Sequence, residues 1–220
     1  MQCYNANGNL LWLLEDPSLD DAHFTHYRDT AMKACALIGD GLLLLNPNEK
    51  KLWILNKDGS DGEFCGNGLM SAAFHLYRTR GQTKIALTMA GQVIDAEVNE
   101  LGVSLILSSN IPNPHLVLVS PPPEWTLLRE GAQLCHSKNT NVEFVYPEAD
   151  GFRALVYERG VGPTGACGSG ALAIFNELKH QGLVGDQAII KMPGGVLTVT
   201  ALHSKLRLQG IVSLNDASLP

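Results

Sequence analysis

The sequence lacks several features that would point to a membrane or a nucleic acid. No run of about 18 apolar residues is present, so no membrane-spanning helix is expected. There is no basic patch either: 16 Lys and Arg face 22 Asp and Glu, for a formal net charge of −6. Nucleic-acid binding needs clustered basic side chains, so it is disfavoured. The first residues carry no basic segment before an apolar core, which predicts a cytoplasmic protein without a signal peptide.

The sequence also lacks the usual signs of a metal or disulfide protein. Its five cysteines form no CxxC pair and no zinc-ligand spacing. No cluster of His, Asp and Glu has the spacing of metal ligands, so no metal site is expected. We therefore expect reduced thiols, as in a reducing compartment.

The sequence does contain two short segments that resemble each other. Cys65-Gly66-Asn67-Gly68 and Cys167-Gly168-Ser169-Gly170 each precede small and apolar residues that predict a helix, over 69–77 and 171–178. With 45% hydrophobic and 17% charged residues, the chain has enough apolar material for real cores. The repeat therefore suggests a duplicated fold with one thiol in each half.

Strand patterns flank each motif in the same order, which predicts an α+β fold of two similar halves. Each half is expected to be a curled sheet around one main helix. The halves are placed at 1–111, with Cys65, and 112–220, with Cys167, and the last strand is a candidate to return to the first half. A strand is expected at the end of 36–45, and the others at 51–56, 83–89, 92–98, 103–107, 116–120, 142–146, 152–157, 188–192, 196–202 and 206–209.

The chemistry of the motifs follows from their position at helix N-termini. A thiol there is acidified by the helix dipole and by nearby backbone N–H groups. The N–H groups of Gly66, Asn67, Gly168 and Ser169 could bind an anion such as a carboxylate. Such donors stabilise the charge that builds up when the α-carbon beside that carboxylate loses its proton.

The motifs closely resemble the two signatures of diaminopimelate epimerases, which are amino-acid racemases that use two cysteines and no pyridoxal phosphate. The second signature extends over residues 158–170, from Glu158-Arg159-Gly160 to Cys167-Gly168-Ser169-Gly170. The remaining matches occur in the order of the family and span nearly the whole chain. They are Gly8-Asn9, Gly39-Asp40-Gly41, Asn56-Lys57-Asp58-Gly59-Ser60, Asn113-Pro114-His115 and Thr140-Asn141-Val142.

The resemblance implies barrel-like sheets with the active site in the cleft between the halves, no cofactor, and a homodimer in many members. It implies that Cys65 and Cys167 exchange a proton with the α-carbon, one as thiolate base and the other as thiol acid. His115 and Glu158 match residues that help to set the thiol pKa values, which completes the implied catalytic set. The substrate-binding positions implied are Asn9, Asn56, Gly66, Asn67, Asn113, Asn141, Glu158, Arg159, Gly168 and Ser169.

Because of departures from the family pattern, the sequence does not determine which amino acid is the substrate. Leu10 and Leu11 replace an acid and an aromatic residue, Pro163 replaces a glutamate, and the chain is shorter than a typical member. Epimerisation of LL-diaminopimelate to the meso form, in lysine and peptidoglycan precursor synthesis, is the leading hypothesis. A racemase of glutamate, histidine, proline or hydroxyproline is the alternative enzyme. The non-enzymatic alternative is a carboxylate-binding relative without catalytic activity, or a redox switch that joins Cys65 to Cys167.

Overall fold

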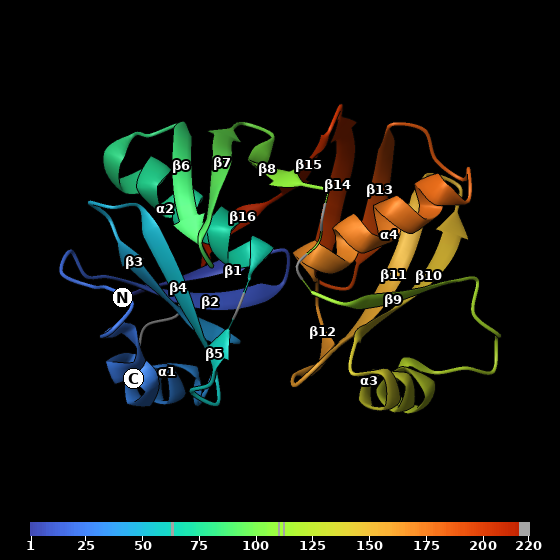
Figure 1. Cartoon of the computed structure of the whole chain (residues 1–220), viewed down its shortest axis with the longest axis horizontal. Coiled ribbons are helices and arrows are strands. Elements are labelled where there is room, and N and C mark those ends of the chain that lie inside the picture. The colour runs from blue at the N-terminus through green and yellow to red at the C-terminus, as the bar shows by residue number, and fades with distance from the viewer. Residues whose placement is uncertain (63, 110, 112, 216–220) are drawn as a thin grey trace. The chain divides into compact units, whose positions relative to one another are not determined.

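The computed structural model describes residues 1–62, 64–109, 111 and 113–215, and its elements are labelled in Figure 1. The chain forms two compact units: unit 1 is Met1–Leu105 with Ile211–Pro220, and unit 2 is Ile106–Gly210. The sequence suggested a boundary after residue 111, slightly beyond the observed boundary after Leu105. The α+β class is confirmed, because a curled mixed sheet and one long helix make up most of each unit.

Unit 1 contains a sheet in the order β16-β1-β2-β3-β4-β6-β7-β8, with β5 paired to β4. Its strands are β1 (Gln2–Ala6), β2 (Asn9–Glu15), β3 (Gly41–Asn46), β4 (Lys51–Asn56), β5 (Asp61–Gly62), β6 (Lys84–Met89), β7 (Gln92–Asn99), β8 (Gly102–Ser108) and β16 (Val212–Asn215). A short 3-10 turn, Phe24–Tyr27, leads into α1 (Arg28–Cys35), and the long helix is α2 (Gly66–Arg80).

The helix α2 packs against β1, β2, β6 and β7. Its apolar residues Leu69, Met70 and Leu76 are fully buried. Burial of each side chain stabilises the folded state by about 2 kcal/mol. The helix ends at Gly81, whose φ of +67° is a left-handed conformation that suits glycine. The helix therefore extends beyond the residues 69–77 expected from the sequence.

Unit 2 contains a sheet in the order β15-β14-β13-β11-β10-β9, with β12 paired to β11. Its strands are β9 (His115–Val119), β10 (Asn141–Glu148), β11 (Gly151–Glu158), β12 (Gly162–Thr164), β13 (Gln187–Met192), β14 (Gly195–Leu202) and β15 (Lys205–Gly210). A π-helical turn, Leu127–Gly131, continues into α3 (Ala132–Lys138), and the long helix is α4 (Gly168–His180).

The two sheets repeat one pattern of strand directions. In unit 1, β2–β3 is parallel, β3–β4 antiparallel, β4–β6 parallel and β6–β7 antiparallel. In unit 2 the same sequence runs through β9–β10, β10–β11, β11–β13 and β13–β14. Each long helix stands at the same point of its series, between β5 and β6 or between β12 and β13. The expected pseudo-symmetry of the fold is therefore confirmed.

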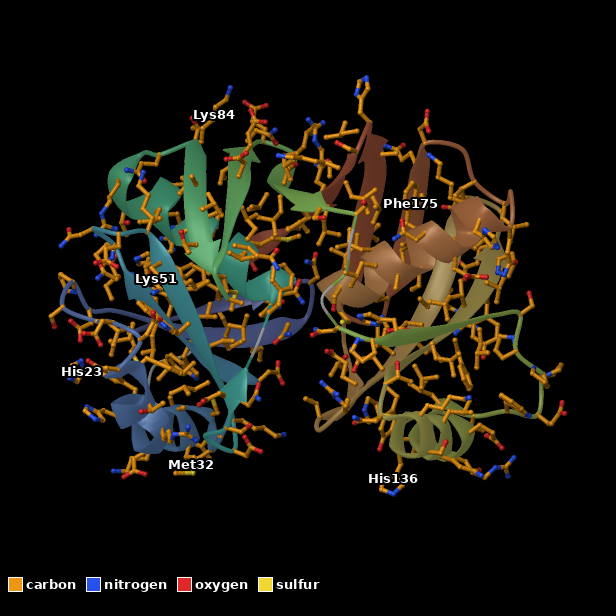
Figure 2. The ribbon with its side chains drawn as sticks, in the orientation of Figure 1. His23, Met32, Lys51, Lys84, His136 and Phe175 are labelled. Carbon is orange, nitrogen blue, oxygen red and sulfur yellow. The ribbon has the colours of Figure 1, made fainter. Side chains whose placement is uncertain are left out.

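Side chains on the outer helices differ from those on the long helices. Met32 on α1 and His136 on α3 project outward in Figure 2, and both are exposed. Phe175 on α4, in contrast, is only 1% exposed. Among the described residues, no helix is both long enough and apolar enough to cross a membrane.

Candidate active site

Each of the two motif thiols caps the N-terminus of a long helix. Cys65 precedes α2 with φ −134° and ψ 104°, and Cys167 precedes α4 with φ −128° and ψ 116°. The Sγ of Cys65 accepts a hydrogen bond from the N–H of Gly68 at 3.2 Å, and that of Cys167 accepts one from Gly170 at 3.3 Å. Because these N–H groups and the helix dipole favour a negative sulfur, both positions suit a thiol that must ionise.

The glycine that follows each thiol by three residues is closely packed. A Cβ on Gly68 would lie 3.3 Å from the Sγ of Cys65, and a Cβ on Gly170 would lie 3.4 Å from the Sγ of Cys167. The nearest atom to such a Cβ differs between the units. It is the Cδ2 of Leu43 at 2.8 Å in unit 1 and the Oε1 of Glu143 at 3.0 Å in unit 2.

The thiol of Cys167 is buried among acidic neighbours. Burial raises the pKa of Cys167 well above its usual value, and the negative charges of Glu158 and Glu143 raise it further. The Ser169 hydroxyl, 3.4 Å from the sulfur, and the N–H of Gly170 oppose this rise. At neutral pH, Cys167 is therefore a thiol and not a thiolate in this state.

The first turn of α2 is held by a buried amide pair. Asn67 is 2% exposed, and its Oδ1 accepts a hydrogen bond from Nδ2 of Asn7 at 3.2 Å. Asn7 also pairs with Ile211 through its backbone and through Oδ1, which ties the β1–β2 turn to the segment before β16. Cys65 itself is half-buried.

His115 and Glu143 form a buried hydrogen-bonded pair in unit 2. Nδ1 of His115 lies 2.6 Å from Oε1 of Glu143, and the two side chains are 3% and 0% exposed. Burial raises the pKa of Glu143, while the hydrogen bond and charge of His115 act against the rise. The other two polar atoms, Nε2 of His115 and Oε2 of Glu143, are buried with no hydrogen-bond partner among the described residues.

The segment before the second motif places its polar residues at the ends of β10 and β11. Thr164 donates a hydrogen bond to Oε1 of Glu158 at 2.5 Å. Oδ1 of Asn141 accepts one from the backbone N–H of Arg159 at 2.8 Å. The exposed guanidinium of Arg159 reaches Oδ1 of Asn139 at 3.5 Å. Unit 2 therefore brings Glu158 within electrostatic reach of Cys167 and ties Asn141 to Arg159.

The other asparagines named from the sequence lie at strand ends. Asn9 starts β2, and its Oδ1 is buried with no hydrogen-bond partner among the residues described. Asn56 ends β4 and donates to the hydroxyl of Ser60 at 3.0 Å. Asn113 precedes β9 and lines a cavity. Asn56 therefore has a local hydrogen-bond partner, whereas the buried Oδ1 of Asn9 has none among the described residues.

The cavity lies in unit 2 beside α4 and has a volume of about 310 Å³. It brings two predicted residues, Asn113 and His115, to one surface. The other lining residues are Ile111, Val117, Ala173, Asn176 and Glu177. Amide, imidazole and carboxylate groups therefore line the same space.

Two buried polar residues, Glu143 and Asn7, were not singled out from the sequence. Glu143 lies within the run Val142 to Tyr146, where a charged residue between apolar ones was a signal that could have been followed. Asn7 directly precedes Gly8, and Asn-Gly is a strong hairpin signal. Within the described ranges, no group of three or more His, Cys, Asp or Glu could hold a metal ion.

Comparison with known proteins identifies the family of the chain. A family model described as diaminopimelate epimerase matches residues 107–219. A diaminopimelate epimerase of Geobacillus thermodenitrificans is 30% identical over 230 residues, covering 78% of each chain. Among solved structures, a phenazine-biosynthesis protein of the PhzF family from Enterococcus faecalis gives a TM-score of 0.75 at 14% identity, covering 97% of this chain and 95% of its own. A hydroxyproline epimerase from Agrobacterium vitis gives 0.66 at 12%, with 97% and 90% covered. At those identities the two structures establish likeness of fold alone.

Proposed function

Because this chain belongs to the diaminopimelate epimerase family and is an isomerase, we propose that it converts LL-diaminopimelate to the meso form in the cytoplasm, as a step toward lysine. The observation that carries the proposal is the matched geometry of Cys65 and Cys167. Each thiol caps a helix and accepts a hydrogen bond from the glycine three residues later. A racemase without a cofactor needs such a pair, one group to remove a proton and one to supply it.

In the proposed reaction, one sulfur as thiolate takes the α-proton and becomes a thiol. The other sulfur, as thiol, gives its proton to the opposite face of the carbanion and becomes a thiolate. The proton count is unchanged, so the reverse reaction uses the same groups with their roles exchanged. First-turn N–H groups at Gly66, Asn67, Gly168 and Ser169 would bind the carboxylate, whose negative charge grows in the transition state.

The environments of the thiols support a starting assignment. The pKa of Cys167 is raised by burial and by Glu158 and Glu143, so this residue begins as the acid. Cys65 then begins as the base. The two titrations are coupled, because turnover requires opposite protonation states.

We assign the remaining substrate contacts to Asn9, Asn56, Asn113, Asn141, Glu158 and Arg159. The exposed guanidinium of Arg159 can bind a carboxylate through two parallel hydrogen bonds. The orphaned Oδ1 of Asn9 can accept from an ammonium group. These are the groups that an amino acid with charged ends requires.

A second candidate keeps the thiol chemistry and changes the amino acid, to one of the glutamate, histidine, proline or hydroxyproline type. It is favoured by Leu10 and Pro163, which stand where the family pattern has an acid and a glutamate. Fewer acidic groups would suit a substrate with fewer ammonium groups.

The test is incorporation of deuterium from solvent into the α-position. LL-diaminopimelate and the four alternative amino acids are incubated with the enzyme in D₂O and followed by NMR and chiral chromatography. We expect one α-hydrogen of LL-diaminopimelate to exchange as the meso isomer accumulates. Exchange confined to another amino acid selects the second candidate. No exchange with any of the five at high enzyme concentration overturns the proposed function.

A further inference from the structure

We propose that Glu143 is a positioning residue that keeps a proton on Nε2 of His115, so that the imidazole presents an N–H donor to an oxygen of the bound substrate. The inference rests on the proposed function for the identity of the substrate. The hydrogen-bonded pair itself is a property of the structure and can be tested without any substrate.

The strands set the geometry of the pair. His115 begins β9 beside Asn141 of β10, and Glu143 lies two residues further along β10. This offset lets Nδ1 of His115 and Oε1 of Glu143 meet at 2.6 Å. Since Glu143 is 0% exposed and His115 3%, water cannot replace either partner. The ring orientation is therefore fixed by Glu143.

Proton counting then determines which ring nitrogen is the donor. If the Glu143 carboxyl keeps its proton and donates it to Nδ1, the neutral ring carries its own proton on Nε2. If the proton moves to Nδ1, the ring is an imidazolium and Nε2 still carries a proton. A carboxylate beside a neutral ring with Nδ1–H leaves Nε2 bare, and that state buries a net negative charge, which is costly. A carboxyl protonated on Oε2 would also leave Nε2 bare, but it would bury an O–H with no acceptor among the described residues.

The surroundings make the third state less favourable still. Glu158 on β11 adds negative charge near Glu143, and Cys167 at the start of α4 lies within reach of both carboxyl groups. The pKa of Cys135 on α3 is raised by burial, lowered by the guanidinium of Arg159 and raised by Glu143. A net-neutral pair is therefore favoured, and when its shared proton lies between Oε1 and Nδ1, Nε2 is an N–H donor.

The donor has no acceptor in the described part of the chain. Nε2 of His115 is buried without a hydrogen-bond partner, and His115 lines the cavity of about 310 Å³. A buried unpaired N–H is costly, so such a group gains from a ligand that supplies an acceptor. A carboxylate oxygen is the acceptor that an amino-acid substrate would bring.

The corresponding region of unit 1 argues against a purely structural role. Leu43 occupies the place of Glu143 beneath the glycine of the motif, and Leu11 takes the register position of His115. Both leucines are buried, and the same strand pattern forms around them. The fold is therefore built without a polar pair at these positions.

The kinetic test uses Glu143→Leu, His115→Gln and the double variant, assayed on LL-diaminopimelate. Leucine is the residue at the matching place in unit 1, and it cannot hydrogen-bond to the ring. We expect Glu143→Leu to lower kcat by about ten- to a hundredfold, the size seen when groups that orient reactive side chains are removed, with a smaller change in KM. Because Glu143 acts through His115, the double variant should be no slower than His115→Gln alone. Multiplying losses, or an unchanged kcat in Glu143→Leu, would overturn the inference.

A matched control comes from the second Glu–His pair of the chain, in unit 1. Nε2 of His75 contacts Oε1 of Glu15 at 2.8 Å, outside the proposed site. Glu15→Leu should leave kcat unchanged. An equal fall in kcat for this variant would mean that the loss in Glu143→Leu reports stability and not positioning.

An NMR measurement separates this inference from the proposed function. In ¹⁵N-histidine-labelled enzyme without substrate, the ring of His115, assigned by its loss in His115→Gln, should carry a proton on Nε2. A bare Nε2 overturns the inference whatever the activity. A protonated Nε2 in an enzyme that exchanges no α-proton leaves the inference standing and refutes the function. This measurement does not use a Glu143 variant, so it holds even where Glu143→Leu fails to fold.

Discussion

The N-termini of α2 and α4 share one backbone and differ in what lies beneath it. Each begins with a cysteine whose sulfur accepts the N–H of a glycine three residues later. Beneath that glycine, unit 1 has Leu43 and unit 2 has Glu143. The comparison shows that the motif and its helix are the structural requirement of the fold, while the buried acid is a separate addition in unit 2.

The buried acid of unit 2 helps to raise the pKa of the thiol beside it. Cys167 is 5% exposed, and burial together with two carboxyl groups raises its pKa well above the usual value. Cys65 is half-buried above a leucine. Two thiols of the same local geometry are therefore expected to begin the reaction in different protonation states.

The largest expected effect comes from removing either thiol. Cys65→Ser and Cys167→Ser should each lower the rate of epimerisation by about a thousandfold, as is typical when a general acid or base is lost. A serine hydroxyl is too weakly acidic to replace a thiolate, although it can still cap the helix. The measurement is kcat/KM in both reaction directions.

Two other buried cysteines provide controls for these variants. Cys35→Ser in unit 1 and Cys135→Ser in unit 2 introduce the same change away from the motifs. Both should retain activity while losing some stability. Full activity in Cys65→Ser or Cys167→Ser would refute the two-thiol mechanism. It would show that the replaced thiol is dispensable.

A smaller effect is expected in thiol alkylation. At pH 8, iodoacetamide should modify Cys65 at least about tenfold faster than Cys167, because only the thiolate reacts and a rise of one pKa unit reduces its fraction about tenfold. Mass spectrometry of peptides gives both rates in one sample. Cys35, whose pKa is raised to about 11, is a slow internal reference. Equal rates, or a faster Cys167, would remove the proposed difference between the thiols.

Much of the fold could be predicted because its signals are local. Apolar runs located β4, β10 and β11, and the cysteine-glycine motifs located the starts of α2 and α4. The hairpin of β1 and β2 was missed, although Asn7 and Gly8 mark its turn with φ values of 53° and 84°. The polar helix α1 was missed as well, since its mean hydropathy is low and its stability comes from packing on β3 and β4.

The candidate site could be predicted only where its residues belong to contiguous motifs. Cys65 and Cys167 were expected at helix N-termini, and each caps a long helix. Glu143 could not be found in this way, because its contact with His115 depends on the register of β9 against β10. The motifs indicate chemistry at one point of the chain, whereas a partner two residues along a neighbouring strand requires the fold.

The smallest expected effect concerns the stability contributed by the two Glu–His pairs, of which only Glu143–His115 is fully buried. The pKa of Glu15 is lowered to about 2, chiefly by hydrogen bonds from Arg80, whereas burial raises the pKa of Glu143. A lowered pKa in the folded state stabilises the protein above the unfolded pKa of about 4.3, and this contribution is lost as the pH falls toward 2. Glu15→Gln should therefore lower the free energy of unfolding at pH 7 by about 1 to 2 kcal/mol, allowing for screening of a partly exposed pair.

Urea unfolding between pH 7 and pH 3 checks the sign. The difference between the wild type and Glu15→Gln should shrink as the pH falls, because the wild-type carboxylate becomes protonated as the pH approaches 2. The pKa of Glu143 is shifted in the opposite direction, so its contribution to the free energy of unfolding is fully present below pH 4.3 and declines as the pH rises.

Asp186→Asn is the control, because Asp186 forms an exposed pair with Lys179. It should change stability by less than about 0.5 kcal/mol at any of these pH values. A loss in Glu15→Gln that stays constant from pH 7 to pH 3 would mean that the Arg80 contact acts through packing and not through charge.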